Sequence, residues 1–184
     1  VMGDPTEGAL KVAALKAGLT DARIRTRFTR VGELPFSAER KLMSTAHTDI
    51  MRDGGQVLFV KGAPDVLLAR CTSERVGDVE RPLDGARRDA VARSIDSLAG
   101  EALRTLGIAY RRLAAVESSG LEPGHEEGLV WLGVVGMIDP PRPEARAAVA
   151  AAQTAGLKVL MITGDHPAAA GAIAAELGIA PAGE

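Results

Sequence analysis

Residues 56–65 have the sequence Gln-Val-Leu-Phe-Val-Lys-Gly-Ala-Pro-Asp and mark a change from strand to helix. Gln56 to Val60 is rich in β-branched and aromatic residues and alternates in part, which predicts a strand. Gly62-Ala63-Pro64 then interrupts the pattern, and a helix is expected to follow it as far as about Cys71. Lys61 therefore ends a strand that is predicted to be buried, and we expect its ammonium group at a sheet edge beside a turn.

The sequence on both sides of this stretch predicts a mixed α/β domain over residues 1–138, with an antiparallel sheet flanked by helices. A first helix is expected to start at Asp4-Pro5-Thr6-Glu7 and to stop at Gly18, and a second is expected from Leu83 to Leu98. Glu74 to Arg81 and Ser118 to Glu127 are polar and predict loops. Four further strands are expected, at Phe28 to Phe36, Lys41 to Ile50, Arg104 to Tyr110 and Leu129 to Ile138.

The clearest boundary is Asp139-Pro140-Pro141-Arg142-Pro143. Three prolines in five residues disfavour both helix and sheet interior, so residues 139–143 are interpreted as a short, stiff hinge. A helix at Glu144 to Ala155, a strand at Lys158 to Ile162 and a helix at Ala168 to Leu177 are expected beyond it. This order predicts part of an α/β unit with a parallel sheet over residues 144–184.

Composition excludes several classes of protein. Hydrophobic residues make up 46% of the chain and charged residues 25%, as in soluble globular proteins. The net charge of −2 offers no basic field for nucleic acid or acidic lipid, so neither nucleic-acid binding nor direct membrane contact is expected. No stretch approaches the ~20 apolar residues that span a bilayer. Cys71 is the only cysteine and the three histidines lie far apart, so no metal site is predicted from these residue types.

Several residues have both an ordinary and a functional interpretation. Thr163-Gly164-Asp165 follows a predicted strand and precedes a helix, where an α/β sheet can bind phosphate, or it is only a tight turn. Phe36 is a core residue or lines a pocket, and Glu7 caps a helix or contacts a ligand. Lys41, Lys61 and Arg104 are surface charges or ligand-binding groups. No Walker loop, dinucleotide fingerprint or nucleophile elbow is present in the sequence.

Six blocks occur in a fixed order across the chain, and together they resemble the nucleotide-binding (N) domain and adjoining phosphorylation (P) domain of P-type ATPases. The resemblance is closest to the calcium-pump-like and sodium-pump-like branch. It implies that residues 1–138 are the N domain without its beginning, and that residues 144–184 are part of a Rossmann-like P domain of the haloacid dehalogenase type. The blocks are Gly3 to Leu10, Pro35-Phe36-Ser37 with Arg40-Lys41, Lys61 to Asp65, Leu103-Arg104 with Ala109, Asp139 to Arg142, and Met161 to His166.

The resemblance also implies a role for each matching residue. Phe36 matches the aromatic residue that stacks on adenine, and Glu7 matches the acidic residue near the adenine amino group. Lys61, with Gly62 after it, matches the lysine deep in the ATP pocket. The remaining residues match groups directed at the ribose and phosphates (Lys41 and Arg104), the hinge (Asp139 and Arg142), and the surroundings of the γ-phosphate and Mg²⁺ (Thr163, Gly164 and Asp165).

The implied parent is an integral membrane enzyme that couples ATP hydrolysis, through an aspartyl-phosphate and with Mg²⁺, to cation transport. This chain would be a soluble part on the cytoplasmic side, working with phosphorylation, actuator and transmembrane domains. The Asp-Lys-Thr-Gly-Thr block that carries the acceptor aspartate is absent, as is the Gly-Asp-Gly-x-Asn-Asp block that holds magnesium. The chain alone is therefore expected to bind ATP or ADP but not to turn ATP over.

Two other functions remain open from the sequence. The chain could be a free-standing phosphatase of the haloacid dehalogenase type, or a non-catalytic interaction module. The transported ion is not encoded in these residues, since ion ligands in such pumps belong to membrane helices.

Overall fold

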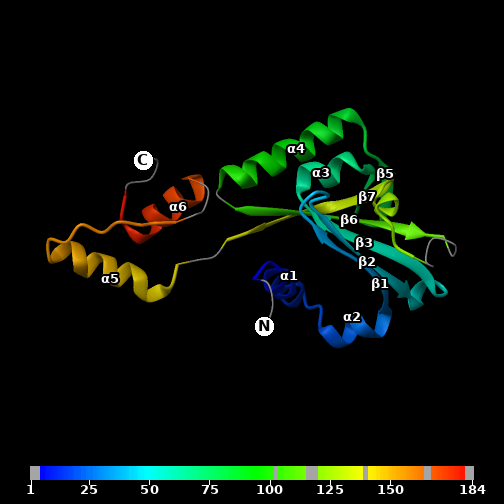
Figure 1. Ribbon diagram of the computed structural model, residues 1–184, viewed down its shortest axis with the longest axis horizontal. Helices are drawn as coiled ribbons and strands as arrows, with labels where there is room; N and C mark the ends of the chain where they lie inside the picture. The colour runs from blue at the N-terminus through cyan, green and yellow to red at the C-terminus, as the bar shows by residue number, and fades with distance from the viewer. Residues whose placement is uncertain (1–4, 102, 115–119, 139–140, 164–166, 181–184) are drawn as a thin grey trace. The chain divides into compact units, whose positions relative to one another are not determined.

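The computed structural model describes residues 5–101, 103–114, 120–138, 141–163 and 167–180. The chain divides into two compact units, each considered by itself below. The first comprises Val1–Ala92 and Thr105–Val135, and the second comprises Arg93–Arg104 and Gly136–Glu184. Figure 1 labels the elements of both units.

The first unit is built on a seven-stranded sheet in the order β1-β2-β3-β6-β7-β4-β5. The pairs β1–β2, β2–β3, β3–β6 and β4–β5 are antiparallel, whereas β4 and β7 are parallel. The predicted α/β fold, a mainly antiparallel sheet flanked by helices, is therefore confirmed, and the parallel pair makes the sheet mixed. The strands are β1 (Phe28–Ser37), β2 (Leu42–Asp49), β3 (Gly55–Gly62), β4 (Cys71–Val76), β5 (Val79–Pro82), β6 (Arg104–Leu113) and β7 (Leu129–Met137).

Helices cover both faces of this sheet. The helix α1 lies on the face opposite to α3, as Figure 1 shows. The helix α1 starts at Pro5 and ends before Gly18, whose φ of +75° suits a glycine, so both sequence signals predicted its ends correctly. The helix α2 was not predicted. The first-unit helices are α1 (Pro5–Lys16), α2 (Asp21–Arg27), α3 (Pro64–Ala69), the single turns η1 (Ile50–Arg52) and η3 (Pro123–Glu126), and the first turns of α4 (Gly85–Gly100).

Alternation along β3 sends its side chains to two hydrophobic layers. Leu58 and Val60 lie on the face toward α3, at 0% and 1% exposure, among other fully buried leucines. Val57 lies on the other face with Tyr110 and Val130, and Phe28 and Phe59 pack against this second cluster. Burying a side chain of this size contributes about 1.5–3 kcal/mol, so the sheet is held on both of its faces.

Glu74 to Arg81 was predicted to be an exposed loop, and this prediction is wrong. These residues lie in the hairpin of β4 and β5, which turns at Gly77 with a φ of +59°. Glu74 is only 3% exposed, and its carboxylate accepts hydrogen bonds from the guanidinium groups of Arg81 and Arg87, each at 2.8 Å. A polar composition therefore concealed strands that are held together by ion pairs.

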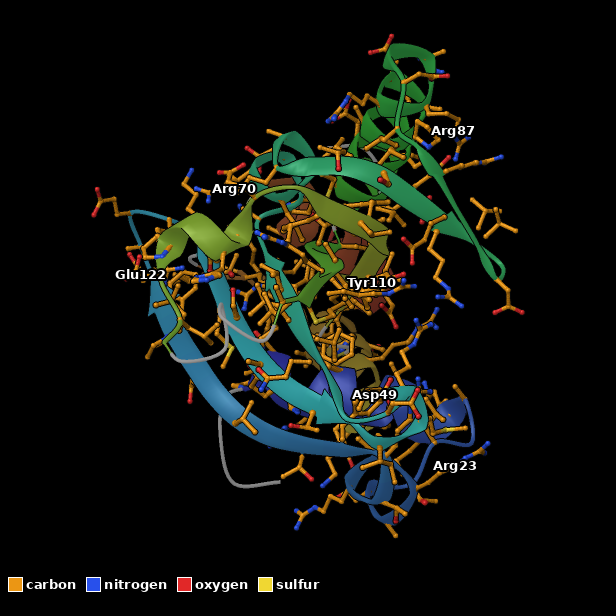
Figure 2. All side chains as sticks on the ribbon, turned by 90° about the vertical axis from the view of Figure 1, so that its right-hand side faces the viewer. Arg23, Asp49, Arg70, Arg87, Tyr110 and Glu122 are labelled. Carbon is orange, nitrogen blue, oxygen red and sulfur yellow. The ribbon has the colours of Figure 1, made fainter. Side chains whose placement is uncertain are left out.

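Asp49, at the end of β2, is a second buried carboxylate and is 3% exposed. Arg27 of α2 donates two hydrogen bonds to it, at 2.9 and 2.8 Å, and the backbone N–H of Met51 donates another at 3.1 Å. Asp49 and the Glu74 partner Arg87 lie on opposite sides of the first unit in Figure 2. The bonds from Arg27 hold the pKa of Asp49 below its ordinary value, and those from Arg87 and Arg81 do the same for the pKa of Glu74.

The second unit contains α5 (Pro143–Thr154) and α6 (Pro167–Leu177), close to their predicted positions. Gly156, with a φ of +77°, ends α5 as predicted. The strand predicted at Lys158 to Ile162 is not formed. Leu160 is 73% exposed and Ile162 is 97% exposed, because no described strand pairs with this segment and a strand is stable only within a ladder.

We predict that Asp49 and Glu74 make the stability of the fold depend on acid. Because both pKa values are lowered in the folded state, their contribution is complete above the unfolded values of about 4 and is lost as the pH falls below them. Urea unfolding at pH 7, 5, 4 and 3 should show a smaller decrease in stability for Asp49→Asn/Glu74→Gln than for wild type. Asp78→Asn, which removes a fully exposed carboxylate, is the control, and equal decreases in wild type and double variant would contradict the prediction.

We also predict that Cys71 is unreactive in the folded protein. Its side chain is 1% exposed and its Sγ donates to the Leu67 carbonyl at 3.2 Å, while burial raises the pKa of the thiol to about 12. The reactive thiolate is therefore scarce at pH 8. Labelling with a thiol reagent should be slow in buffer and stoichiometric in urea. Fast, complete labelling of protein that remains folded would contradict the burial of this residue.

Candidate functional site

The turn before β2 and the turn after β3 touch through their backbones. Lys41 adopts a φ of +56°, and its N–H donates to the Ser37 carbonyl at 2.7 Å. Its own carbonyl accepts a hydrogen bond from the Ala63 N–H at 3.1 Å. A Cβ on Gly62 would lie 2.2 Å from this carbonyl oxygen, so only glycine fits at this position. Gly62, which the sequence analysis had singled out beside Lys61, thus permits a close approach of two backbone segments.

Lys61 lies on β3 between Met43 of β2 and Ile108 of β6. Its ammonium group forms an ion pair with the carboxylate of Glu7, which comes from the first turn of α1. The Lys61 side chain is 21% exposed and that of Glu7 is 53% exposed. The pair joins the N-terminal end of α1 to the sheet, and it brings together two residues that the sequence analysis had singled out separately.

Phe36 lies near the end of β1 and is 64% exposed, so it is not a core residue. The next residue, Ser37, is paired with Leu42, which in turn is paired with Gly62. Phe36 therefore lies two strands away from Lys61, near the same end of the sheet. An exposed ring, an exposed lysine at position 41 and the Lys61–Glu7 ion pair thus lie at the same end of the sheet.

The other predicted site residues belong to the second unit or lie outside the described residues. Arg104 is exposed at the start of β6, and Arg142 is exposed at the start of α5, where its carbonyl accepts from the Ala145 N–H at 2.9 Å. Thr163 is exposed and follows the extended segment 157–162. Three predicted residues, Asp139, Gly164 and Asp165, lie outside the described part of the chain.

Arg40 and Glu126 make a contact that the sequence analysis missed. Arg40 Nη1 donates to Glu126 Oε1 at 2.5 Å, and Arg40 Nη2 donates to the Pro35 carbonyl at 2.5 Å. The Ser44 hydroxyl donates to the same Glu126 oxygen at 2.5 Å. Arg40 had a signal, since it adjoins Lys41 in one of the six blocks. Glu126 had none, because it lies 86 residues away in a segment whose polar composition predicts a solvated loop.

The candidate site is an open surface, and a separate, half-open pocket lies elsewhere on the first unit. A cavity of about 630 Å³ is found at the opposite end of the sheet, where Asp49, Gly55 and Val57 contribute to its lining. Among the described residues, no group of three or more His, Cys, Asp or Glu side chains could hold a metal ion. In the same part of the chain, no helix has both the length and the apolar character needed to cross a bilayer.

The fold is a mixed α/β domain whose sheet has an open, charged surface at one end. A sequence model of the family described as P-type ATPase, cytoplasmic domain N, matches residues 1–144. The chain therefore belongs to this family. A second family model, described as haloacid dehalogenase-like hydrolase, matches residues 112–183 and supports the Rossmann-like unit predicted beyond the hinge.

Curated relatives are named as cation- or calcium-transporting ATPases. The chain is 40% identical over 193 residues to the cation-transporting ATPase pma1 of Synechocystis sp., with 100% of this chain and 20% of the relative covered. It is 38% identical over 179 residues to a calcium-transporting ATPase of Bacillus subtilis, covering 97% and 20% of the two chains. It is 41% identical over 181 residues to the probable cation-transporting ATPase F of Mycobacterium tuberculosis, covering 97% and 19%. The chain thus spans about a fifth of the length of these relatives.

The contact at Gly62 predicts a strong effect of a single methyl group. Gly62→Ala would place Cβ against the Lys41 carbonyl and 2.9 Å from the Leu42 Cα, and backbone atoms cannot move aside cheaply. We expect a loss of roughly 1–3 kcal/mol in the free energy of unfolding. Gly85→Ala is the matched control, because nothing lies within 4 Å of its Cβ position, and it should change stability by no more than about 1 kcal/mol. Equal stability of the two variants in urea would contradict the close approach.

Proposed function

We propose that this chain is the ATP-binding part of a cation-transporting P-type ATPase, located on the cytoplasmic side of a membrane. Residues 1–138 would form the N domain, residues 139–143 the hinge, and residues 144–184 part of the P domain. The observation that carries the proposal is the Lys61–Glu7 ion pair at the end of the sheet where Phe36 is exposed. The names of the relatives support the transport function of the whole protein.

The side chains in the first unit fit an adenine nucleotide. An exposed aromatic ring offers a face for stacking, which is the role proposed for Phe36. Glu7 can accept a hydrogen bond from the adenine amino group, and Lys61 can donate to a ring nitrogen beside it. Because Lys61 is already neutralised by Glu7, we assign it to the base and not to the phosphates. Lys41 would then interact with the ribose and phosphates as an exposed cation. The same role is proposed for Arg104, an exposed cation of the second unit.

In the whole protein, the proposed task of these residues is to bind and orient ATP for transfer of its γ-phosphoryl group to an aspartate. Bound Mg²⁺ would offset the charge of the phosphates. Asp139 and Arg142 would belong to the hinge, and Thr163, Gly164 and Asp165 would lie near the γ-phosphate and Mg²⁺. The phosphorylation, actuator and transmembrane domains would be the partners of this chain. Because the acceptor-aspartate block is absent from these 184 residues, we propose that the chain binds ATP without hydrolysing it.

We predict that Phe36→Ala weakens binding of ATP, ADP and AMP to a similar extent, because the three ligands share the base. Loss of a base-stacking ring costs about 1–3 kcal/mol, which corresponds to about 5- to 150-fold in affinity. Isothermal titration calorimetry on protein shown to be folded would measure this. Val79→Ala is the control, since Val79 is also 64% exposed but lies on β5, at the other edge of the sheet. Normal ATP affinity in Phe36→Ala would contradict the stacking role.

Two further measurements separate the candidate functions. Lys61→Ala should weaken the binding of AMP and ATP equally, whereas a loss that grows from AMP to ATP would place the lysine at the phosphates.

Wild type should release no phosphate from ATP or p-nitrophenyl phosphate in the presence of Mg²⁺. Sustained turnover would instead favour a phosphatase. The match to the haloacid dehalogenase-like hydrolase family is consistent with that alternative. Absence of both binding and turnover would favour an interaction module.

A further inference from the structure

We propose that Glu126 is a positioning residue for the nucleotide site, acting through Arg40 on residues 35–41, which comprise the end of β1 and the turn after it and are called the Phe36 turn below. The inference rests on the proposed nucleotide-binding function and extends it to a residue of η3. Glu126 is 0% exposed and therefore cannot touch a ligand itself. Its influence would be exerted through the two hydrogen bonds of the Arg40 guanidinium group.

The burial of Glu126 makes the geometry of its contact with Arg40 restrictive. A carboxylate removed from water must be compensated by hydrogen bonds and opposite charge. Arg40 supplies both at 2.5 Å, its side chain is only 15% exposed, and Ser44 donates to the same carboxylate oxygen. Moving Arg40 away would leave a buried charge without its nearest partner. The guanidinium group is therefore held in one place.

The second hydrogen bond of Arg40 carries this constraint to the turn. Arg40 Nη2 donates to the Pro35 carbonyl, so one planar group connects Glu126 with the residue before Phe36. The Arg40 N–H also donates to the Ser37 hydroxyl at 3.4 Å, which links the two ends of the same turn. Phe36 lies inside this closed segment.

The exposure of Phe36 explains why such a constraint matters. A ring that is 64% exposed is not fixed by packing, so its direction is set mainly by the backbone that carries it. Holding a binding loop in its bound conformation before the ligand arrives raises affinity, because less conformational entropy is lost on binding. The Arg40–Glu126 pair would hold the backbone around Phe36 in one conformation, through contacts on the buried side of the turn.

Glu126 is also bordered by a second arginine. Arg70 Nη1 lies 3.8 Å from Glu126 Oε2 and 3.2 Å from Glu127 Oε1. Figure 2 shows Arg70 near the η3 turn, which begins just after Glu122. Among the described residues, Glu126 Oε2 has no hydrogen-bond partner, whereas Oε1 accepts hydrogen bonds from Arg40 and Ser44. The carboxylate oxygen that contacts Arg40, Oε1, thus makes shorter contacts than Oε2 does.

A positioning role differs measurably from a purely structural one. If Glu126 only anchors η3, its substitution lowers stability but leaves the ATP affinity of the folded protein unchanged. If it positions the turn, affinity falls in folded protein and the fall depends on Phe36. Glu74→Gln is a matched control, because Glu74 is also a buried carboxylate with two arginine partners in the same unit, and it lies on β4, toward the opposite edge of the sheet from β1.

The test is a double-mutant cycle on ATP affinity, measured by calorimetry on protein whose folded state is verified by circular dichroism. Glu126→Gln should weaken ATP binding about 3- to 10-fold, a fraction of the effect of a charged hydrogen bond. Glu74→Gln should leave affinity within about 2-fold of wild type. In a Phe36→Ala background, Glu126→Gln should cause little further loss, because the ring that it positions is gone.

Arg40→Lys provides a second route if Glu126→Gln fails to fold. Lysine keeps the positive charge but has no planar guanidinium group to donate to both Glu126 and the Pro35 carbonyl. The same 3- to 10-fold loss of ATP affinity is therefore expected without a change in net charge. Normal ATP affinity in folded Glu126→Gln or Arg40→Lys, or an undiminished loss in the Phe36→Ala background, would overturn the positioning role alone. Failure of wild type to bind ATP would instead overturn the proposed function and the positioning role with it.

Discussion

The close approach of the Lys41 carbonyl to Gly62 and Ala63 is the constraint on which the candidate site depends. It joins the turn before β2 to the turn after β3 by backbone atoms alone. The first turn follows Phe36 at the end of β1, and the second follows Lys61 at the end of β3. The relative position of the backbone at Phe36 and at Lys61 is therefore set by strand pairing and one hydrogen bond. A binding surface that is open to solvent needs such support, because no packed core defines its shape.

Buried carboxylates paired with arginine fix the periphery of the same sheet. Asp49 fastens α2 to the end of β2, Glu74 fastens α4 to the β4–β5 hairpin, and Glu126 fastens η3 to the Phe36 turn. Only 3% of the residues are aromatic, so large rings are scarce as packing elements. Buried ion pairs add little net stability compared with hydrophobic packing, but they impose a defined geometry on the groups that they join. The fold thus uses aliphatic burial for stability and charge pairs for alignment.

The sequence predicted the elements whose signals are local. Alternation along β3, proline at the start of α1 and glycines at positions 18 and 156 identified strands and helix ends because each reports a backbone preference of its own residues. Local signals also selected Lys61 and Gly62, where a strand meets a turn. They did not show that Lys61 and Glu7 form a pair, since the pair joins residues 54 positions apart. Composition and local spacing do not predict contacts between residues that lie far apart in the sequence.

The two wrong predictions, at residues 74–81 and 158–162, also arise because the outcome depends on partners far away in the sequence. Glu74 to Arg81 looked like a loop because its charges suggest solvent, yet a charge with partners can be buried within a strand. Lys158 to Ile162 looked like a strand because its side chains favour one, yet its backbone has no ladder to join among the described strands. A strand exists only when another strand satisfies its N–H and C=O groups. A sequence pattern thus specifies which residues are suited to pairing, and the presence of the partner decides whether the element forms.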